Sequence, residues 1–565
     1  MQVHSVFYNS SLKHFIAGIL RILNRREKLR LCTLIALDLL IGVLDIAFLG
    51  VLLLIINYYT KGGTPNNFLF TLSGGKGSLW LIGVFFLLFG LKNFAGYRIA
   101  STGNTFFYEV ASRLSKRNIL QYLHDDYLRF VHVGSSVHIR SISQQPIEFS
   151  NYILTNVQQV ISQSILIFFT IVAILFYHPV IFFLLFLLLL PPVVVLAYFI
   201  KKQLGQVRAH TKQTSEKTIQ HLQESLSGYV EGNVYDKHEF FINRYFGYQQ
   251  QLNNNIAKQQ SLQGLPARLI EVFAVLGFFI LIAINKFAAN APAINLLTIG
   301  VFMAASYKII PGIVKILNSA GQMKTYEFTL NDLFPDKADV PGRKKSTLTE
   351  PVNSIKFEAV DFKYKHQQVL KNLNFELLPG DFAGIQGKSG MGKTTIINIL
   401  LGFLEQDAGN ISINNKITDL SGRQDYWFKI SYVKQQPFFI NDTILKNITL
   451  SDDGYDAGKL TETLAFCGID AMLQQYPEGI SKIITENGKN ISGGQRQRLM
   501  LARALYHEFD LLILDEPFSE MDELAEQMIL EKLSGLAKQQ KIILFITHNK
   551  NSLAYCNKLI APDGE

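Results

Sequence analysis

Eight consecutive residues in the second half of the chain have the composition of a phosphate-binding loop. They run Gly387-Lys388-Ser389-Gly390-Met391-Gly392-Lys393-Thr394 and fit the pattern G-x-x-x-x-G-K-[ST]. The apolar run Phe382 to Ile385 predicts a strand before the loop, and Thr394 to Leu401 predicts a helix after it. The glycines let backbone N–H groups surround a phosphate, Lys393 supplies a cation for the β- and γ-phosphates, and the Thr394 hydroxyl can bind Mg²⁺. The loop therefore indicates a nucleoside triphosphate site.

Two carboxylates follow a second apolar run. Leu511 to Leu514 predicts a buried strand, and Asp515 and Glu516 stand at its end. The aspartate suits Mg²⁺, held directly or through water, and the glutamate suits the polarisation of an attacking water molecule. A buried strand that ends in Asp-Glu is common in itself, so the pair gains its meaning from the phosphate loop.

The most specific motif is Ile491-Ser492-Gly493-Gly494-Gln495, followed by Arg496-Gln497-Arg498. It resembles the signature sequence of ATP-binding cassette (ABC) proteins. With the phosphate loop and Asp515-Glu516, the chain is identified as similar to an ABC transporter half-molecule of the exporter order, in which the membrane domain precedes the nucleotide-binding domain. The resemblance covers essentially the whole chain and is strongest from about 357 to 550. Ile491 stands where leucine is usual.

The resemblance implies roles for further residues. Tyr364 is similar to the aromatic residue that stacks on adenine, and Gln435 to the glutamine that reaches Mg²⁺ and the water, with Lys434 in place of the usual proline. Ser519 to Asp522 resembles the D-loop, with Glu520-Met521 replacing a small residue and a leucine, and His548 looks like the switch histidine that contacts the γ-phosphate. The implied sites are Glu516, His548 and Gln435 for catalysis; Thr394, Gln435 and Asp515 for Mg²⁺; Ser519 and Asp522 for the D-loop; and, for ATP, Tyr364 with Gly387, Lys388, Ser389, Gly390, Met391, Gly392, Lys393, Thr394 and Thr395.

The signature implies a second copy. In this family the residues that match Ser492, Gly493, Gly494 and Gln495 complete the ATP site of another nucleotide-binding domain, at a helix N-terminus. One chain carries one set of halves, so function is expected to require a dimer. Because Lys393, Gln435, Glu516, His548 and Ser492 are all intact, a homodimer with two competent sites is the economical expectation, and a heterodimer stays open.

These motifs must be positioned by strands that alternate with helices, a pattern that begins at Ile355. The preceding half differs. Hydrophobic residues make up 48% of the 565-residue chain and concentrate before about residue 325. Six stretches predict membrane helices, each near or above the roughly 20 residues needed to cross a bilayer: about 31–57, 79–100, 152–177, 179–200, 266–286 and 295–317. The uncharged run from Val180 to Ile200 argues against a buried helical domain of a soluble protein.

The connections between these stretches predict the orientation. Two of them, about 101–151 and 201–265, are long, helix-forming and rich in Lys and Arg, whereas the others are short. Both termini should therefore be cytoplasmic in a multi-pass protein of the cytoplasmic (inner) membrane. This topology also accounts for the net charge of +9, so no nucleic-acid partner is expected. No cleavable signal peptide is evident, and the three scattered cysteines predict no disulfide framework.

The expected architecture is multidomain: an all-α transmembrane domain of six helices, followed by a cytoplasmic α/β P-loop ABC ATPase domain. Residues 1–29 predict an amphipathic elbow helix on the cytoplasmic leaflet, 30–325 the transmembrane domain, 326–354 a linker and 355–565 the nucleotide-binding domain. The segments Ser135 to Ile142 and Gly228 to Phe240 are the expected force-transmitting contacts of the two long loops.

The fusion of six spans to an ATPase resembles ATP-driven exporters and flippases that use ATP and Mg²⁺. Pro266 to Glu271, Ala304 to Pro311 and Ser135 to Arg140 are similar to segments of bacterial lipid-linked oligosaccharide flippases. Arg268, Lys308 and Lys315 are substrate-path candidates, because intramembrane cations are costly unless they face water or an anion such as a phosphate headgroup. The alternative for these lysines is snorkelling or pairing with an acid such as Glu271.

The expected cargo is a lipid-linked oligosaccharide or a related amphipathic phospholipid in the bilayer. The alternatives are a peptide, bacteriocin, toxin or drug exporter of the same architecture without a peptidase domain, a soluble cassette ATPase, which the six spans disfavour, and an ATP-gated channel.

Overall fold

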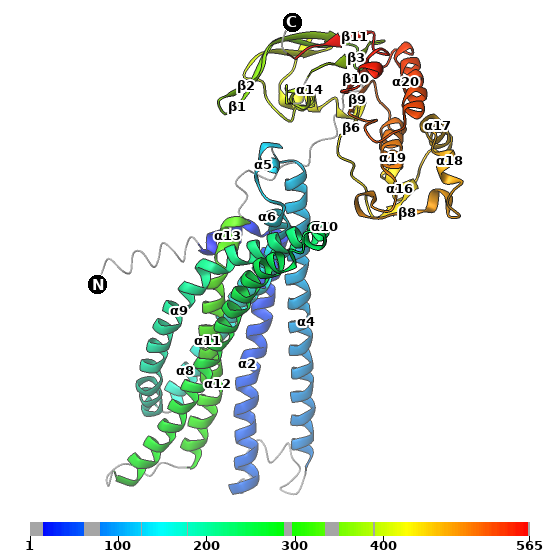
Figure 1. The fold of residues 1–565 in the computed structure, drawn as a ribbon. Helices are drawn as coiled ribbons and strands as arrows, with labels where there is room; N and C mark the ends of the chain where they lie inside the picture. The colour runs from blue at the N-terminus through cyan, green and yellow to red at the C-terminus, as the bar shows by residue number, and fades with distance from the viewer. Residues whose placement is uncertain are drawn as a thin grey trace. The chain divides into compact units, whose positions relative to one another are not determined.

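The computed structural model describes residues 15–61, 79–125, 127–177, 179–287, 296–333, 350–387 and 390–562. The chain divides into two compact units, one made of Met1–Asp125 and His132–Val340, the other of Asp126–Val131 and Pro341–Glu565. Among the described residues, the first unit is helical and the second contains the β-strands (Figure 1). The predicted fold class, a helical membrane domain followed by an α/β domain, is confirmed.

Among the described residues, six long helices form most of the first unit, and each predicted apolar stretch lies largely on one of them. They are α2 (Arg25–Lys61), α4 (Trp80–Leu123), α8 (Thr155–Tyr177), α9 (Pro179–Ser227), α11 (His238–Phe287) and α12 (Leu296–Thr325). The helices α9 and α11 have 49 and 50 residues. At 1.5 Å per residue each is about 75 Å long, more than twice the hydrocarbon thickness of a bilayer. Both therefore have room for a span and for a long extension beyond it.

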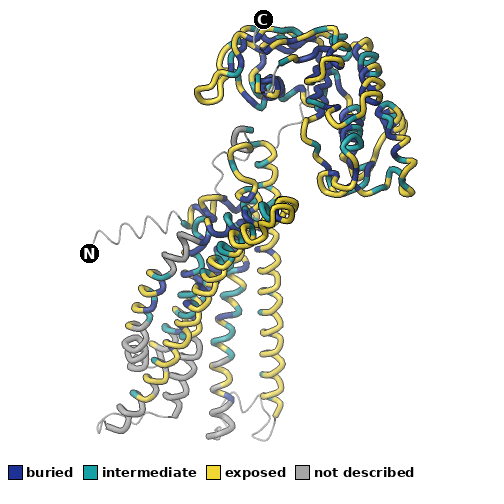
Figure 2. The backbone as a smooth tube through the Cα atoms, in the orientation of Figure 1, coloured by how far each residue is buried: buried dark blue, intermediate teal, exposed yellow. Residues whose placement is uncertain are grey.

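The outer surface of these helices is apolar. Within the described residues, Arg25–Leu52, Trp80–Leu123 and Ser135–Val172 are long and apolar enough to cross a membrane. Large apolar side chains on them point outward: Phe86 is 76% exposed and Leu87 61%. Figure 2 shows α4 as mostly exposed along its length. Such a surface suits lipid as its surroundings rather than water.

Polar side chains join the spans to one another. Lys92 of α4 is 8% exposed and pairs with Asp45 of α2, and its ammonium lies 4.6 Å from the ring centroid of Phe89. The Asn156 amide of α8 donates to Gln322 of α12 at 2.8 Å. Because lipid offers no competing partner, such contacts hold helices in register. The Lys92–Asp45 pair was not predicted from the sequence.

The N-terminal segment packs on this unit. Residues 15–22 are helical. Ile19, Ile22 and Leu23 are buried in a cluster with Phe106 and Phe107 of α4, whereas Ile16 and Leu20 are 48% and 43% exposed. One apolar face therefore meets protein, and a second is left outside.

The first long connection is a helix interrupted twice by π-helical turns. Its pieces are α6 (Ser135–Ile139), η1 (Arg140–Gln144), α7 (Gln145–Phe149) and η2 (Ser150–Leu154). Arg140 is fully buried; it donates to Glu148 at 2.8 Å, lies 3.9 Å from Glu216 of α9, and stacks 5.0 Å from the ring centroid of Phe328. Phe328 begins the short helix α13 (Phe328–Asp332), whose Asp332 accepts from Gln145 at 2.8 Å. Residues 328–332, expected within the linker, are thus packed against both long connections.

The second unit is built on a five-stranded parallel sheet in the order β11-β3-β10-β9-β6. Its strands are β3 (Phe382–Ile385), β6 (Ile430–Val433), β9 (Leu511–Asp515), β10 (Ile542–Ile546) and β11 (Lys558–Ile560). The strands β3, β9 and β10 are buried along their whole length. Continuous apolar runs of this kind are expected where helices cover both faces of a parallel sheet.

Two smaller sheets accompany it. One has the order β2-β1-β4-β5 and the other pairs β7 with β8. Their strands are β1 (Ile355–Tyr364), β2 (Gln367–Leu377), β4 (Ala408–Ile413), β5 (Lys416–Ile417), β7 (Asp442–Thr443) and β8 (Ile483–Ile484). The helices of this unit are α5 (Tyr127–His132), which extends one residue past its segment, α14 (Lys393–Leu400), α15 (Leu420–Gln424), η3 (Trp427–Lys429), α16 (Ile444–Thr449), α17 (Ala457–Cys467), α18 (Asp470–Leu473), η4 (Gly479–Ser481), η5 (Glu486–Gly488), α19 (Gly493–Tyr506), α20 (Glu523–Lys538) and α21 (Lys550–Leu553).

Candidate nucleotide-binding site

The predicted catalytic residues follow neighbouring strands of the parallel sheet. The order β3-β10-β9-β6 puts four carboxyl ends side by side. The phosphate loop follows β3, His548 follows β10, Asp515 and Glu516 end β9, and Gln435 follows β6. Residues scattered over more than 160 positions of sequence therefore meet at one edge of the sheet, as ligand sites of open α/β sheets do.

The phosphate loop has the backbone that its glycines predict. Gly390 and Gly392 have φ of +86° and +83°, a region that side chains disfavour. A Cβ atom on Gly392 would also lie 2.7 Å from Val369 of β2. The loop leads directly into α14, which opens with Lys393; Thr394 is exposed and Thr395 is buried. Lys388 and Ser389 lie outside the described residues.

Four side chains meet beyond the loop. The Lys393 ammonium donates to the Gly387 carbonyl at 2.9 Å and lies 3.1 Å from His548 Nε2 and 3.3 Å from His548 Nδ1. His548 Nε2 lies 3.0 Å from Glu516 Oε1, and Gln435 Nε2 donates to Glu516 Oε2 at 2.9 Å. The Glu516 carboxylate is thus held from two sides.

Glu516 also has an unusual backbone. Its φ is +51°, and its N–H donates to the Ile546 carbonyl of β10 at 3.0 Å. Holding a glutamate in the left-handed backbone conformation costs on the order of 1–3 kcal/mol of folding free energy, and residues in such conformations cluster at functional sites. This conformation turns the chain sharply after β9.

Burial changes the acidity of two neighbouring groups. It lowers the pKa of Lys393, although the Glu516 and Asp515 carboxylates act in the opposite direction. Burial, and then the Glu516 charge, raises the pKa of Asp515 to about 6. The Tyr432 hydroxyl donates to Asp515 Oδ2 at 3.4 Å. Because its surroundings destabilise the ionised form of Asp515, this carboxylate favours either a proton or a nearby cation.

The oxygen donors near the loop fit a magnesium ion. The Thr394 hydroxyl, the Asp515 carboxylate and the Gln435 side-chain carbonyl are hard oxygen ligands of the type that Mg²⁺ prefers. The Gln435 amide nitrogen is engaged by Glu516, so its carbonyl oxygen is the atom that remains for a metal or a water.

The candidate adenine platform lies on β1. Tyr364 is 44% exposed and meets the ring of Phe362 edge-on at 4.9 Å. It pairs with Gln367 at the start of β2, the strand whose Val369 touches Gly392. A half-exposed aromatic ring near the loop can stack on a base.

The signature and the D-loop form a separate group. Ser492 caps α19, and its side chain and that of Gln495 form a capping box: Gln495 N donates to Ser492 Oγ at 3.3 Å, and Ser492 N to Gln495 Oε1 at 3.0 Å. Gln497 of α19 donates to Ser519 at 2.8 Å, and Asp522 caps α20. The helices α14 and α19 lie apart within the second unit (Figure 1).

The substrate-path candidates lie on membrane helices. Arg268 of α11 and Lys315 of α12 are both exposed, and the Lys308 side chain lies outside the described part of α12.

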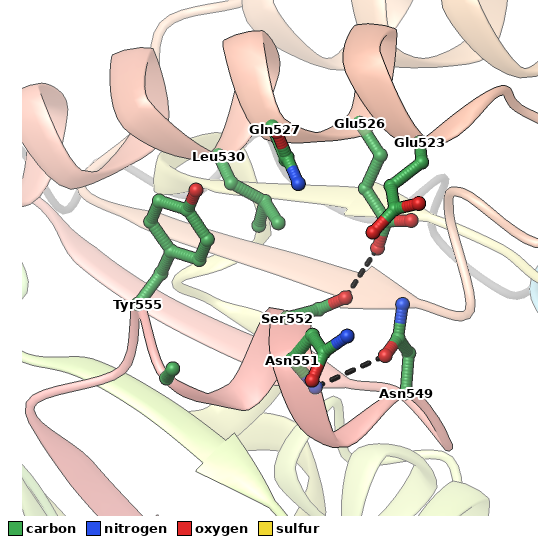
Figure 3. A pocket seen from close by; sticks show the side chains of 9 residues that line it. Glu523, Glu526, Gln527, Leu530, Asn549, Asn551, Ser552 and Tyr555 are labelled. Carbon is green, nitrogen blue, oxygen red and sulfur yellow. Dashed lines mark hydrogen bonds between the residues drawn. The ribbon is translucent and has the colours of Figure 1, made fainter.

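A polar cavity of about 390 Å³ is lined in part by Asn549, which follows His548 in sequence (Figure 3). It opens between α20 and the segment Asn549 to Tyr555. At its floor the Ser552 hydroxyl, 2% exposed, donates to Glu526 of α20. This bond connects the helix that follows the D-loop to the helix that follows His548.

Sequence reasoning missed one contact of the first long connection. Tyr127 of α5 stacks on Phe403 with ring centroids 4.9 Å apart, and Phe403 in turn contacts Trp427 at 5.2 Å. Within the first unit, the Asn118 amide donates to the Ser141 carbonyl of the predicted segment Ser135 to Ile142 at 2.7 Å. The force-transmitting role of that segment stays a prediction. The sequence around Tyr127 offers no local signal for the contact with Phe403, because Phe403 is far away in the chain.

Fold and site together define a P-loop nucleotide-binding domain on the same chain as a helical membrane domain. A family model described as the ABC transporter matches residues 370–519, and one described as the ABC transporter transmembrane region matches residues 150–305. The chain belongs to the ABC transporter family, as a half-transporter that fuses both parts.

Similar proteins agree with this assignment. An ABC transporter ATP-binding/permease protein of Haemophilus influenzae is 30% identical over 228 residues, which cover 40% of this chain and 41% of that protein. An export ATP-binding/permease protein of Rickettsia bellii is 34% identical over 233 residues, 40% of each chain. The matches thus span about two fifths of these relatives' lengths. An ATP-dependent lipid A-core flippase of Xanthomonas campestris is 27% identical over 354 residues, 61% of this chain and 59% of that protein.

The fold is shared over nearly the whole chain. The structure of a bacterial Atm1-family ABC exporter with ATP bound superimposes with a TM-score of 0.74 at 19% identity, covering 96% of this chain and 94% of the other.

Proposed function

We propose that this protein hydrolyses ATP in the cleft of a two-copy assembly and uses the cycle to move an amphipathic substrate out of, or across, a membrane. The observation that carries the proposal is the convergence of Lys393, Glu516, His548 and Gln435 on adjoining strand ends, with Glu516 held at 2.9–3.0 Å by two of them. A carboxylate fixed beside a phosphate loop is suited to polarise a water molecule for attack on the γ-phosphate.

Each residue of the site has a role in this proposal. Lys393 binds the β- and γ-phosphates and loses its present contact with His548 when they arrive. His548 then contacts the γ-phosphate through one ring nitrogen and keeps Glu516 in place through the other, and Tyr364 stacks on the adenine. Thr394, Asp515 and Gln435 would hold Mg²⁺, which would neutralise charge on the phosphates.

Two features support a homodimer. The helix α19, which follows Ser492, lies apart from α14, which follows the phosphate loop (Figure 1). A second copy would bring the signature of one chain to the loop of the other. The tip between α9 and α11, which includes α10 (Tyr229–Val234), exposes Tyr229 by 73% and Val234 by 71%. An apolar tip of this kind needs a protein partner, and the matching domain of the second copy is the economical one.

The membrane orientation follows from charge. The Lys- and Arg-rich extensions of α4, α9 and α11 belong on the cytoplasmic side, which leaves both termini there, in the cytoplasmic membrane. The domain boundaries proposed are 1–29, 30–325, 326–354 and 355–565.

The cargo proposed is a lipid-linked oligosaccharide or a related phospholipid amphipath. Exposed cations at Arg268 and Lys315, together with Lys308, suit a phosphate headgroup. The similarity to a lipid A-core flippase over 61% of the chain agrees with a lipid cargo. The second candidate is a peptide, toxin or drug exporter of the same architecture. The similarity to an export ATP-binding/permease protein supports this alternative.

The test uses the full-length protein in proteoliposomes. Mg-ATP hydrolysis is expected, and Glu516→Gln should lower it at least about 100-fold, the size of a general-base contribution. A labelled polyprenyl-linked sugar and a labelled peptide are offered in parallel; translocation of the sugar lipid alone supports the proposed cargo, and translocation of the peptide alone refutes it. Wild-type hydrolysis no faster than that of Glu516→Gln would refute the ATPase.

The headgroup role has its own variant. Lys308→Ala with Lys315→Ala should abolish stimulation of hydrolysis by the sugar lipid and leave basal turnover intact. Lys324→Ala is the control, because that lysine lies on the same helix and pairs with Glu327 at 2.7 Å.

A further inference from the structure

Glu520 lies in the turn between β9 and α20, where the ABC pattern has a small residue. The backbone of this turn is fastened to α19. Gln497, which is 8% exposed, donates to Ser519 Oγ at 2.8 Å and accepts from the Glu520 N–H at 2.9 Å. The main chain of Glu520 is thus fixed beside the signature helix.

The Glu520 side chain occupies the space over the signature glycines. A Cβ atom on Gly493 would lie 1.7 Å from Glu520 Oε2 and 2.9 Å from Glu520 Cβ, and one on Gly494 would lie 3.2 Å from the Glu520 carbonyl oxygen. Arg496 donates to the same Oε2 at 2.9 Å. The two glycines therefore accommodate an acidic side chain of their own chain.

The N-terminus of α19 is a favourable place for the Glu520 carboxylate. The helix α19 has 14 residues and no acidic residue in its first turn, and a helix N-terminus stabilises a nearby negative charge. The capping box occupies the polar side chains of Ser492 and Gln495 at the same end. The N-terminus of α19 therefore already has an anion beside it, the Glu520 carboxylate of the same chain.

We infer that Glu520 competes with the γ-phosphate that a second copy brings to the signature, and so sets the ATP concentration at which two copies close. The inference rests on the proposed function, because it needs nucleotide shared between copies. A phosphate and a carboxylate of like charge cannot share the space over Gly493 and Gly494. Closure therefore requires the carboxylate to leave, and its 48% exposure allows it to swing into solvent, away from Arg496.

The experiment measures ATP occlusion by the full-length protein in nanodiscs, in the Glu516→Gln background that prevents turnover. Glu520→Gln keeps the shape and removes the charge, and Glu520→Ala removes the side chain. Both should lower the ATP concentration for half-maximal occlusion about five-fold, the effect of removing one charge at a helix end. Glu523→Gln removes an exposed carboxylate three residues away, in the first turn of α20, and should leave that concentration unchanged.

The outcomes separate two failures. Where the parent occludes ATP and both Glu520 variants need as much ATP as the parent or more, the competition is refuted. Where the parent occludes no ATP at any concentration, the proposed function itself fails. Binding of a fluorescent ATP analogue without Mg²⁺, which reports the phosphate loop alone, should be equal in all variants; a loss in the Glu520 variants would also refute the inference, because it would trace the effect to the fold.

Discussion

The two acidic residues at the end of β9 are adjacent in sequence, yet their surroundings differ. Asp515 is 3% exposed and has one weak polar contact, to Tyr432. Glu516 is held by Gln435 and His548. Burial raises the pKa of Asp515 to about 6, so ionising it in the apo protein at neutral pH costs on the order of 3 kcal/mol. A bound cation would offset this free energy by stabilising the ionised carboxylate.

The first prediction follows from the sign of this shift. Because the pKa of Asp515 in the folded protein is above the usual value of 3.8, the folded state takes up a proton as the pH falls from about 6 to about 4. Stability from this group is present at low pH and is lost as the pH rises through that window. Asp515→Asn should therefore raise the melting temperature of the apo protein at pH 7.5 by a few degrees, and the gain should vanish near pH 4.

The matched control is Asp510→Asn, at the other end of β9. Asp510 pairs with Lys541 at 3.1 Å and accepts from the Val352 N–H at 3.1 Å, so its loss should lower the melting temperature at neutral pH. A pH-independent gain for Asp515→Asn would show that desolvation of the carboxylate is not the cause. Magnesium-dependent hydrolysis should be lost in Asp515→Asn throughout.

At the scale of elements, a charged cluster joins several described helices of the first unit. Arg140 of η1 lies among Glu148 of α7, Glu216 of α9 and Phe328 of α13. The cluster ties three segments separated by more than 60 residues each, and one of them leads to the nucleotide-binding domain.

The second prediction concerns this cluster. Arg140→Met leaves Glu148 without its cation and should cost about 3–5 kcal/mol of unfolding free energy. The double variant Arg140→Met with Glu148→Gln should recover a large part, because no uncompensated charge remains. The measurement is denaturant unfolding in detergent. Arg30→Met is the control, since Arg30 and Glu109 form an exposed pair, 67% and 58%, and its loss should cost under about 1 kcal/mol. Equal costs for single and double variants would contradict the role of the pair.

The sequence predicted elements better than contacts between them. Motifs that carry their own backbone requirement, such as Gly390 and Gly392, and long apolar runs, such as Val180 to Ile200, could be placed from local composition alone. The pairing of Lys92 with Asp45 and the burial of Arg140 could not, because each depends on the register of helices distant in sequence. Tyr127 was missed for the same reason: nothing local distinguishes an aromatic residue that stacks on Phe403.

At the scale of the whole molecule, the separation of α14 from α19 bears on the proposed assembly of two copies. If each ATP site joins the phosphate loop of one copy to the signature of the other, two lesions have different effects when they share a chain and when they do not. Lys393→Ala destroys the loop half, and Ser492→Glu blocks the signature half by adding bulk and negative charge at the end of α19.

The last prediction uses two differently tagged copies purified as mixed dimers. With Lys393→Ala on one copy and Ser492→Glu on the other, one composite site loses both halves and the other keeps both, so roughly half of the wild-type ATP hydrolysis should remain unless the two sites depend on each other. With both changes on one copy and a wild-type partner, each composite site loses one half and hydrolysis should fall to the background of the Glu516→Gln dimer. Sites contained within one chain predict the reverse order, because only the second arrangement then includes an intact copy. The ranking of the two mixed dimers therefore decides the assembly even if the absolute rates differ from one half.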